Sequence, residues 1–357
     1  MNSTITVLIT GAGSPGAPGV IKSLRSVKDM PFNIIGVDMN GSVAASGLVD
    51  RFIQGPKATD PEFTKRLLRI CSQHQVDVIL PLVSKELPIF SVHKTDFKKI
   101  GTDVSVSDVE PLAKALNKGV MLQFLETEGF PIPQYEIVRT AEGLKKAIRN
   151  LGYPKKPVCF KPAISDGSRG FRILDENKNR LELLFEEKPC SVYLNEMELL
   201  DILQGCEEIP ETVVMEYLPN EEYSVDLLAD HGRVLIAIPR LRQKIQSGIS
   251  VQSKIVKEDD VIKYTSDIVE ALGLHGNIGV QVRRDQSGNP KIIEINPRIQ
   301  GTIVHCTAAG VNLPYLSVKL AKGIPIEEDE LSVHWGVQMV RYWNEVFFAE
   351  DGTLINY

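Results

Sequence analysis

Three polar side chains alternate with apolar ones in the segment Lys-Ile-Ile-Glu-Ile-Asn-Pro-Arg, residues 291–298. Such alternation is typical of a β-strand, in which successive side chains point to opposite faces. The polar residues therefore share one face, and they are Glu294, Asn296 and Arg298. Ile293 and Ile295 should point into a core on the other side. A carboxylate, a carboxamide and a guanidinium on one surface favour a binding site over a plain solvated strand.

A second strand-like segment, residues 277–284, precedes this one across the turn-forming residues 285–290. A hairpin symmetric about Ser287-Gly288 places Gln281 directly opposite Glu294, on the same face. A carboxylate and two carboxamide oxygens are hard ligands, suited to Mg²⁺ that is held by few protein groups and completed by phosphate oxygens. We therefore interpret Gln281, Glu294 and Asn296 as metal ligands. The alternative is the polar outer face of a hairpin.

The composition is that of an ordinary globular protein. The chain has 357 residues, of which 43% are hydrophobic, and this length favours two or three domains. Its net charge of -6 argues against a general nucleic-acid binder. No apolar run is long enough to span a membrane and no signal peptide opens the chain, so we expect a cytoplasmic protein. The five cysteines have no metal-site spacing, which favours reduced thiols.

The chain opens with a strand, Thr4–Thr10, a glycine-rich turn over residues 11–19 and a helix that ends near Val27. A second strand ends in Asp38, which completes the formal pattern of a dinucleotide-binding motif. Any β-α-β unit needs a tight glycine turn, however, and two prolines in this loop remove backbone donors that a pyrophosphate would use. A nicotinamide-dependent oxidoreductase is therefore an alternative rather than the leading hypothesis.

Further β-α units follow, with a helix over residues 61–74, a buried strand over residues 77–82 and a loop that carries Ser84, Lys85 and Glu86. This order predicts an open parallel sheet, in which ligands bind beyond the carboxyl ends of the strands. The glycine loop, Asp38 and Glu86 would then border one pocket. Helix capping or exposed loop charge is the alternative for the two acids.

Two lysines occupy unusual places in the middle of the chain. Lys118 follows the helix cap Asn117, where the positive end of the helix dipole disfavours a cation unless an anion is near. Lys161 lies in a predicted strand, residues 157–163, which leads into the loop Ser165-Asp166-Gly167-Ser168-Arg169-Gly170. Backbone N–H groups of such a loop can close over phosphates, although an ordinary hairpin loop would look the same.

A further strand, residues 212–218, ends in Met-Glu-Tyr-Leu before Pro219. A strand broken by proline exposes backbone groups that could pair with a purine edge, but a domain hinge has the same features.

Taken in order, these features resemble the ATP-grasp superfamily of ATP-dependent ligases. The residues that carry the resemblance are Lys118, Lys161, Ser165 to Gly170, Met215 to Leu218, Glu222, Gln281, Glu294, Asn296, Pro297 and Arg298. Within the superfamily the chain looks most like the carbamoyl-phosphate-synthase-like and pyrrolysine-biosynthesis-ligase-like members. A full carbamoyl phosphate synthase subunit carries two such modules, so that likeness would describe ancestry better than activity.

The resemblance implies an α/β and α+β fold in three parts. A Rossmann-like domain over residues 1–116 would precede a small lobe over residues 117–217 and a large lobe over residues 218–357. ATP would lie between the two lobes. The implied nucleotide-binding residues are Lys118, Lys161, Ser165, Gly167, Ser168, Gly170, Glu216, Tyr217, Leu218 and Glu222, the last of these holding the ribose.

The resemblance also implies the chemistry. Gln281, Glu294 and Asn296 would hold one or two Mg²⁺ ions, or Mn²⁺, while Arg298 and Lys161 act on the transferring phosphoryl group. A small-molecule carboxylate would form an acyl phosphate that an amine attacks, giving ADP and phosphate. Substrate pockets in such enzymes are built from loops of the first domain and the last lobe, so Arg240, Arg242 and the segment Gly301–His305 are candidates for contacts with the carboxylate. A homodimer is a further expectation. A regulatory protein that binds ATP but has lost turnover is another alternative.

Overall fold

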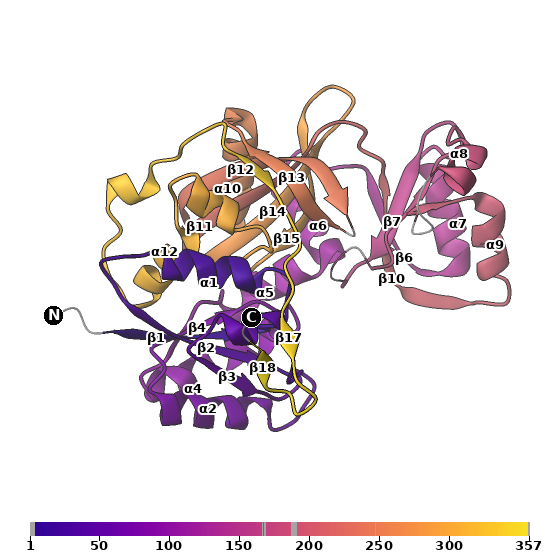
Figure 1. Cartoon of the computed structure of the whole chain (residues 1–357). Coiled ribbons are helices and arrows are strands. Elements are labelled where there is room, and N and C mark those ends of the chain that lie inside the picture. The colour runs from indigo at the N-terminus through magenta and orange to yellow at the C-terminus, as the bar shows by residue number, and fades with distance from the viewer. Residues whose placement is uncertain (1–3, 166, 168, 187–190, 247, 356–357) are drawn as a thin grey trace. The chain divides into compact units, whose positions relative to one another are not determined.

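The computed structural model describes residues 4–165, 167, 169–186, 191–246 and 248–355 (Figure 1). The chain divides into two compact units. The first unit comprises residues 1–116, 222–282 and 293–357, and the second comprises residues 117–221 and 283–292. No helix among the described residues combines the length and the apolar character that crossing a membrane would take.

The first unit opens with a parallel five-stranded sheet in the order β3-β2-β1-β4-β5. Its strands are β1 (Ile5–Thr10), β2 (Phe32–Asp38), β3 (Arg51–Gln54), β4 (Val78–Pro81) and β5 (Asp103–Val104). The connecting helices are α1 (Ala17–Arg25), η1 (Ala44–Gly47), α2 (Phe63–His74), α3 (Leu87–Val92), α4 (Lys94–Lys99) and α5 (Val109–Leu116). The alternating β and α segments in the sequence predict this parallel sheet, which is confirmed.

Both faces of this sheet are covered, because alternate residues of its central strand enter different cores. Val7 and Ile9 pack with α1, while Leu8 packs with α2 and α3. Figure 1 shows α2 and α4 on one side of the sheet and α1 on the other. Continuous burial of a parallel strand is the reason that β1 reads as an apolar run rather than as an alternating one.

The first unit also contains a six-stranded sheet in the order β15-β14-β11-β12-β13-β16. Its strands are β11 (Glu222–Asp230), β12 (Arg233–Gln246), β13 (Ile249–Ile255), β14 (Gly276–Arg284), β15 (Pro290–Asn296) and β16 (Gln338–Val340). The helices are α10 (Asp259–Leu272), α11 (Val304–Ala308), α12 (Leu313–Ala321) and η2 (Glu328–Leu331), and a small hairpin joins β17 (Phe347–Phe348) to β18 (Leu354–Ile355). The tip of the β14–β15 hairpin is counted with the second unit.

One apolar core connects the two sheets of the first unit. It includes Val20 and Leu24 of α1, Cys306 of α11 and Leu316 of α12. Helix α1 contacts both α11 and α12, and the segment after β15 approaches the opening glycine loop where Gly301 meets Gly16. Segments nearly three hundred residues apart in the sequence are therefore parts of one folded body.

The second unit is built on a five-stranded sheet in the order β6-β10-β7-β8-β9. Its strands are β6 (Tyr135–Thr140), β7 (Val158–Pro162), β8 (Arg172–Leu174), β9 (Tyr193–Leu194) and β10 (Glu208–Glu216), and its helices are α6 (Lys118–Thr127), α7 (Ala141–Asn150), α8 (Arg180–Phe185) and α9 (Glu196–Ile202). Leu144 and Ile148 of α7 pack on Val158 and Val214 of the sheet. This packing fixes β7, the strand that carries Lys161.

Candidate functional site

Strand β15 presents the predicted metal ligands. The Asn296 side chain donates a hydrogen bond from Nδ2 to Glu294 Oε1 at 3.0 Å, so the two side chains lie on one face. Gln281 lies on β14, the neighbouring strand of the sheet. The position of Gln281 directly opposite Glu294 stays a prediction. A carboxylate with carboxamide oxygens beside it fits a hard divalent ion such as Mg²⁺.

The other face of β15 differs in one detail from the sequence-based expectation. Ile295 is buried, but Ile293 is only half-buried, and Ile292 is fully buried. Alternation places Ile292 on the same side as Glu294. Both faces of this strand are therefore partly covered, which a simple two-sided pattern does not describe.

A half-buried ion pair lies near Gln281. Arg242 donates to Glu222 and lies 3.5 Å from Gln281 Oε1, measured from Nη1. Its Nη2 also donates to the Gly248 carbonyl at 2.7 Å. Arg242, a candidate for substrate contact, is thus engaged with Glu222 in this structure. Because the two residues lie across neighbouring antiparallel strands, this pairing follows from the sheet register rather than from local sequence.

Arg298 connects the metal strand to the first sheet. Its Nε donates to Ser84 Oγ at 3.0 Å and its Nη1 donates to the Ile299 carbonyl at 3.0 Å. Ser84 lies in the loop after β4, at the carboxyl end of the parallel sheet. The structure thus brings together two segments that the sequence singles out separately.

The same loop contains a buried acid. Glu86 is 8% exposed. The hydroxyl of Thr10, at the end of β1, donates a hydrogen bond to Glu86 Oε2 at 2.5 Å. Burial raises the pKa of Glu86 to about 7, against the lowering effect of the Thr10 hydrogen bond, and the charge of Asp38 adds to the rise. A carboxyl group that titrates near neutral pH is suited to proton transfer.

The opening glycine loop is occupied by protein groups. The Gly13 N–H donates to Asp38 Oδ2 at 2.7 Å, and a Cβ added to Gly16 would lie 2.7 Å from the Gly301 Cα. Two backbones therefore meet where a dinucleotide-binding loop would need room for a pyrophosphate. This close approach explains the glycines by packing, and it argues against the nicotinamide-dependent alternative.

The guanidinium of Arg240 is fully buried, and it lies next to Thr302, the residue after Gly301. Arg240 donates from Nε to Asp226 Oδ2 at 2.5 Å and from Nη1 to Thr302, while its Nη2 is buried without a hydrogen-bond partner among the described residues. Arg341 donates to the Gly301 carbonyl at 2.7 Å and is half-buried, and this burial lowers its pKa. Sequence reasoning names Arg240 but misses Arg341, because an arginine in an irregular terminal segment carries no local signal.

In the second unit, Lys118 is anchored at the start of α6. The cap side chain Asn117 accepts hydrogen bonds from the N–H groups of Gly119 and Val120. Lys118 is buried, and its Nζ donates to the Ser165 carbonyl at 3.0 Å. The predicted first-turn lysine thus meets the predicted phosphate loop.

Lys161 is buried on β7, opposite Val213 of β10. Cys159 lies two residues earlier on the same strand, and burial raises the pKa of its thiol to about 11, while the nearby Lys161 charge opposes this rise. The loop that follows turns through left-handed backbone at Gly167 and Gly170, where a side chain would be strained. Ser168, also predicted to bind the nucleotide, lies outside the described residues.

The predicted hinge follows β10. Glu216 Oε1 accepts the Gln134 N–H at 3.0 Å, the Tyr217 N–H donates to the Pro157 carbonyl at 3.3 Å, and Leu218 is buried. The Arg283 guanidinium stacks 4.9 Å from the centre of the Tyr217 ring. The hinge backbone is therefore held on the sheet of the second unit, whereas Glu222 belongs to the first unit.

Family models match most of the chain in two parts. The model described as ATP-grasp in the biosynthetic pathway with Ter operon matches residues 208–345, and the model described as PylC-like, N-terminal domain, matches residues 7–117. The carbamoyl phosphate synthase large chain of Methanobrevibacter smithii is 22% identical over 281 residues, which are 76% of this chain and 25% of that protein. The chain thus spans a quarter of the length of that relative.

Solved structures share the fold. The ADP complex of N5-carboxyaminoimidazole ribonucleotide synthetase aligns with a TM-score of 0.69 and 17% identity, over 95% of this chain and 82% of that one. The L-amino acid ligase of Bacillus licheniformis aligns with a TM-score of 0.61 and 17% identity, over 93% of this chain and 78% of that one. At these identities the likeness shows the fold alone. The matched regions identify an ATP-grasp region over residues 208–345 and a PylC-like N-terminal domain over residues 7–117.

Proposed function

We propose that this protein is an ATP- and Mg²⁺-dependent ligase that joins a carboxylate to an amine through an acyl phosphate, with release of ADP and phosphate. The observation that carries the proposal is the end of β15, where Glu294 and Asn296 are followed by Arg298. Arg298 is bonded in turn to the loop at the carboxyl end of the first sheet. The ATP-grasp match over residues 208–345 supports the same conclusion.

Glu294, Asn296 and Gln281 would hold the metal. When bound, Mg²⁺ shields phosphate charge and stabilises the transferring phosphoryl group. Charge compensation is essential, since two unit charges 4 Å apart repel by about 4 kcal/mol at an effective dielectric of 20. Lys118 and Lys161 would add positive charge, and both are buried, which strengthens their effect on an anion.

The phosphate loop would complete the nucleotide site. Lys118 already contacts Ser165, the first residue of that loop, and backbone N–H groups at Gly167 and Gly170 are in turn conformations that can face an anion. We infer that Glu216, Tyr217 and Leu218 hold the adenine, and that Glu222, paired with Arg242, binds the ribose.

The acid substrate would bind beside Arg298, beyond the carboxyl ends of β1 and β4. In this step a carboxylate oxygen attacks the γ-phosphorus and ADP leaves. The amine then attacks the acyl carbon, phosphate leaves, and the amine gives up a proton. Glu86 titrates near pH 7 and would accept that proton. A guanidinium and a buried acid in one loop region favour a substrate with both a carboxylate and an amino group, that is, an amino acid.

A screen of amino acids in pairs for phosphate release from MgATP tests the proposal. We expect release well above the rate with ATP alone for at least one pair, together with a new product one water lighter than the sum of the two substrates. If ATP binds in a Mg²⁺-dependent manner but no pair accelerates phosphate release, the ligase proposal fails and the chain is an ATP-binding protein without this turnover.

A further inference from the structure

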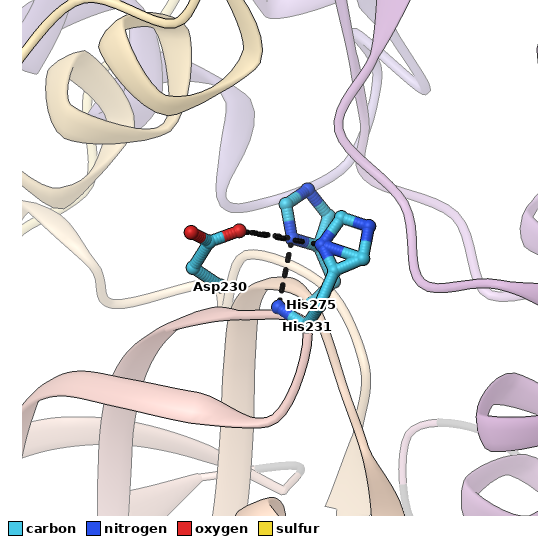
Figure 2. A group of neighbouring side chains, drawn as sticks. All are labelled: Asp230, His231 and His275. Carbon is cyan, nitrogen blue, oxygen red and sulfur yellow. Dashed lines mark hydrogen bonds and ion pairs between the residues drawn. The ribbon is translucent and has the colours of Figure 1, made fainter.

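A cluster of two imidazoles and a carboxylate lies in the first unit, at residues that the proposed ligase site does not use. Asp230 ends β11, His231 follows it in the turn to β12, and His275 directly precedes β14. One ligand atom from each of these residues lies within 4.8 Å of the other two (Figure 2). The two rings are tilted against each other with their centres 4.2 Å apart.

The backbone holds the cluster in place. His231 and Gly232 form the two-residue turn between β11 and β12, and both have positive φ, 46° and 89°. A histidine in left-handed backbone is uncommon. On the other side, the His275 backbone is held by Ser107, whose hydroxyl accepts the His275 N–H at 2.9 Å and donates to its carbonyl at 3.0 Å. The backbone at His231 and His275 is therefore held in place, which limits where their imidazole rings can lie.

Two of the distances within the cluster match the ligand spacing of a tetrahedral ion. Asp230 Oδ1 lies 3.3 Å from His231 Nδ1 and 3.6 Å from His275 Nδ1. Metal–ligand bonds of about 2.1 Å at tetrahedral angles place neighbouring ligand atoms about 3.4 Å apart. A good hydrogen bond between these groups would be shorter, at about 2.8 Å. The contacts are thus long for ion pairs and close to what a shared metal requires.

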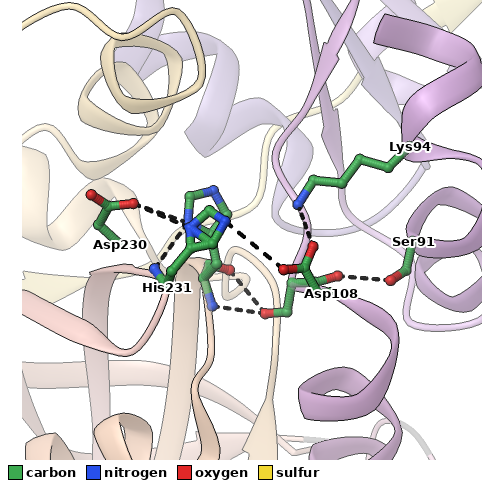
Figure 3. A network of polar contacts seen from close by, with 7 residues as sticks. Ser91, Lys94, Asp108, Asp230 and His231 are labelled. Carbon is green, nitrogen blue, oxygen red and sulfur yellow. Dashed lines mark hydrogen bonds and ion pairs between the residues drawn. The ribbon is translucent and has the colours of Figure 1, made fainter.

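A second carboxylate stands behind one of the imidazoles. Asp108 Oδ2 lies 3.9 Å from His231 Nε2, on the side of the ring away from Asp230 Oδ1 (Figure 3). Lys94 holds the other oxygen of Asp108 at 3.0 Å. A metal-binding histidine commonly donates its second N–H to a carboxylate, which fixes the ring and raises its basicity. Asp108 is placed for that task.

Two acids and two basic side chains surround the cluster. The nearby acids are Asp230 and Asp108, while Lys94 is paired with Asp108 and Arg233 Nη2 lies 3.8 Å from Asp230 Oδ2. His231 is more than half exposed, which gives an ion access from solvent.

We propose that Asp230, His231 and His275 bind a divalent transition-metal ion of the Zn²⁺ class, with a water molecule in the remaining position. Two nitrogen ligands and one carboxylate suit such an ion rather than Mg²⁺, which prefers oxygen. The site is separate from the oxygen ligands on β15, and it connects the β11–β12 turn to the loop before α5. It goes beyond the proposed ligase activity and does not depend on it.

The test is calorimetric titration of the metal-stripped full chain with ZnCl₂ in buffer that contains excess Mg²⁺. We expect one Zn²⁺ per chain, and binding at least about 100-fold weaker in His231→Asn, because loss of an outer partner alone weakens metal sites 10- to 100-fold. Asparagine tolerates left-handed backbone, so this variant should keep the turn. Asp108→Asn should weaken binding about 10-fold or more.

A control variant and a spectroscopic measurement complete the test. His74→Asn, in α2, is the matched control and should bind Zn²⁺ as the unmodified chain does. Co²⁺ in place of Zn²⁺ should give a visible absorption band that His275→Asn or His231→Asn removes. The proposal is overturned if the unmodified chain binds no stoichiometric Zn²⁺, or if His231→Asn and His74→Asn both bind it with unchanged affinity. ATP plays no part in either readout, so the ligase proposal stands or falls separately.

Discussion

Glu86 provides the clearest electrostatic prediction at the scale of single residues. Its pKa is raised from 4.5 to about 7 by burial, so the folded chain keeps a proton that the unfolded chain has already released between these values. Stability therefore falls as the pH rises through this window, by an amount on the order of 3 kcal/mol in total. Below pH 4.5 both states hold the proton and the effect vanishes.

Glu86→Gln removes this titration. Urea unfolding at pH 5 and at pH 8 should show that the variant loses less free energy of unfolding over this interval than the unmodified chain, by about 1 to 3 kcal/mol. Glu128→Gln, at an exposed position after α6, is the control and should leave the pH dependence unchanged. Equal pH slopes for Glu86→Gln and the unmodified chain would contradict a raised Glu86 pKa.

Lys161 tests the proposed phosphate contact. Lys161→Met keeps the length and apolar stem of the side chain but removes its charge, so we expect ATP turnover to fall by about 10²- to 10³-fold, the usual cost of one lost group that stabilises developing charge. Lys155→Met, on an exposed position of the preceding loop, should have no effect. Steady-state phosphate release measures both. Turnover that survives in Lys161→Met would remove this lysine from the site.

The sequence predicts which side chains share one face of a strand, but it does not predict contacts between residues that are far apart in the sequence. Glu294 and Asn296 share a face because they are two residues apart on a strand. The pairing of Arg298 with Ser84 joins positions 214 residues apart, and no local pattern indicates it. No local pattern indicates the ion pair of Arg242 with Glu222 either, because it depends on the register between strands β11 and β12.

At the scale of single elements, the N-terminus of α6 positions Lys118. Asn117 Oδ1 accepts the N–H groups of Gly119 and Val120, and its Nδ2 donates to Glu211 at 3.0 Å. Asn117→Ala should lower the free energy of unfolding by about 1 kcal/mol, the usual value of a helix cap, and should raise the ATP concentration needed for half-maximal binding. Asn179→Ala, the cap of α8, should have a similar cost without the change in ATP binding. If Asn117→Ala lowers the free energy of unfolding but leaves ATP affinity unchanged, the proposed contact between Lys118 and the nucleotide is wrong.

Helices and strands with strong local signals were predicted to within a few residues, while irregular segments were not. The sequence pattern also predicts a helix over residues 141–151, which is observed as α7, Ala141–Asn150, with Thr140 as its cap. Residues 187–208 show little periodicity, so the sequence assigns them no element, yet their described part contains β9 and α9, the latter with a capping box at Asn195. Short elements of this kind are set by packing against their neighbours, which periodicity over a few residues cannot reveal.

For the whole molecule, the alternation of β and α segments predicted the parallel sheet, and the resemblance predicted the ATP-grasp fold; both are confirmed. The three-part division at residues 116 and 217 stays a prediction. Contact density instead groups the first sheet with the sheet of β11–β16, because α1, α11 and α12 share one core. Such grouping depends on contacts between the two ends of the chain, which the sequence pattern does not contain.

The central claim is that the oxygen ligands on β15 hold the metal of a bound nucleotide. Its most direct test is calorimetric titration of ATP into the full chain with and without Mg²⁺, for the unmodified protein, Glu294→Ala and the exposed control Glu128→Ala. We expect Mg²⁺ to strengthen ATP binding in the unmodified chain and in Glu128→Ala, and to have no such effect in Glu294→Ala, whose thermal stability should be nearly unchanged. Mg²⁺-dependent ATP binding of equal strength in Glu294→Ala would contradict the claim.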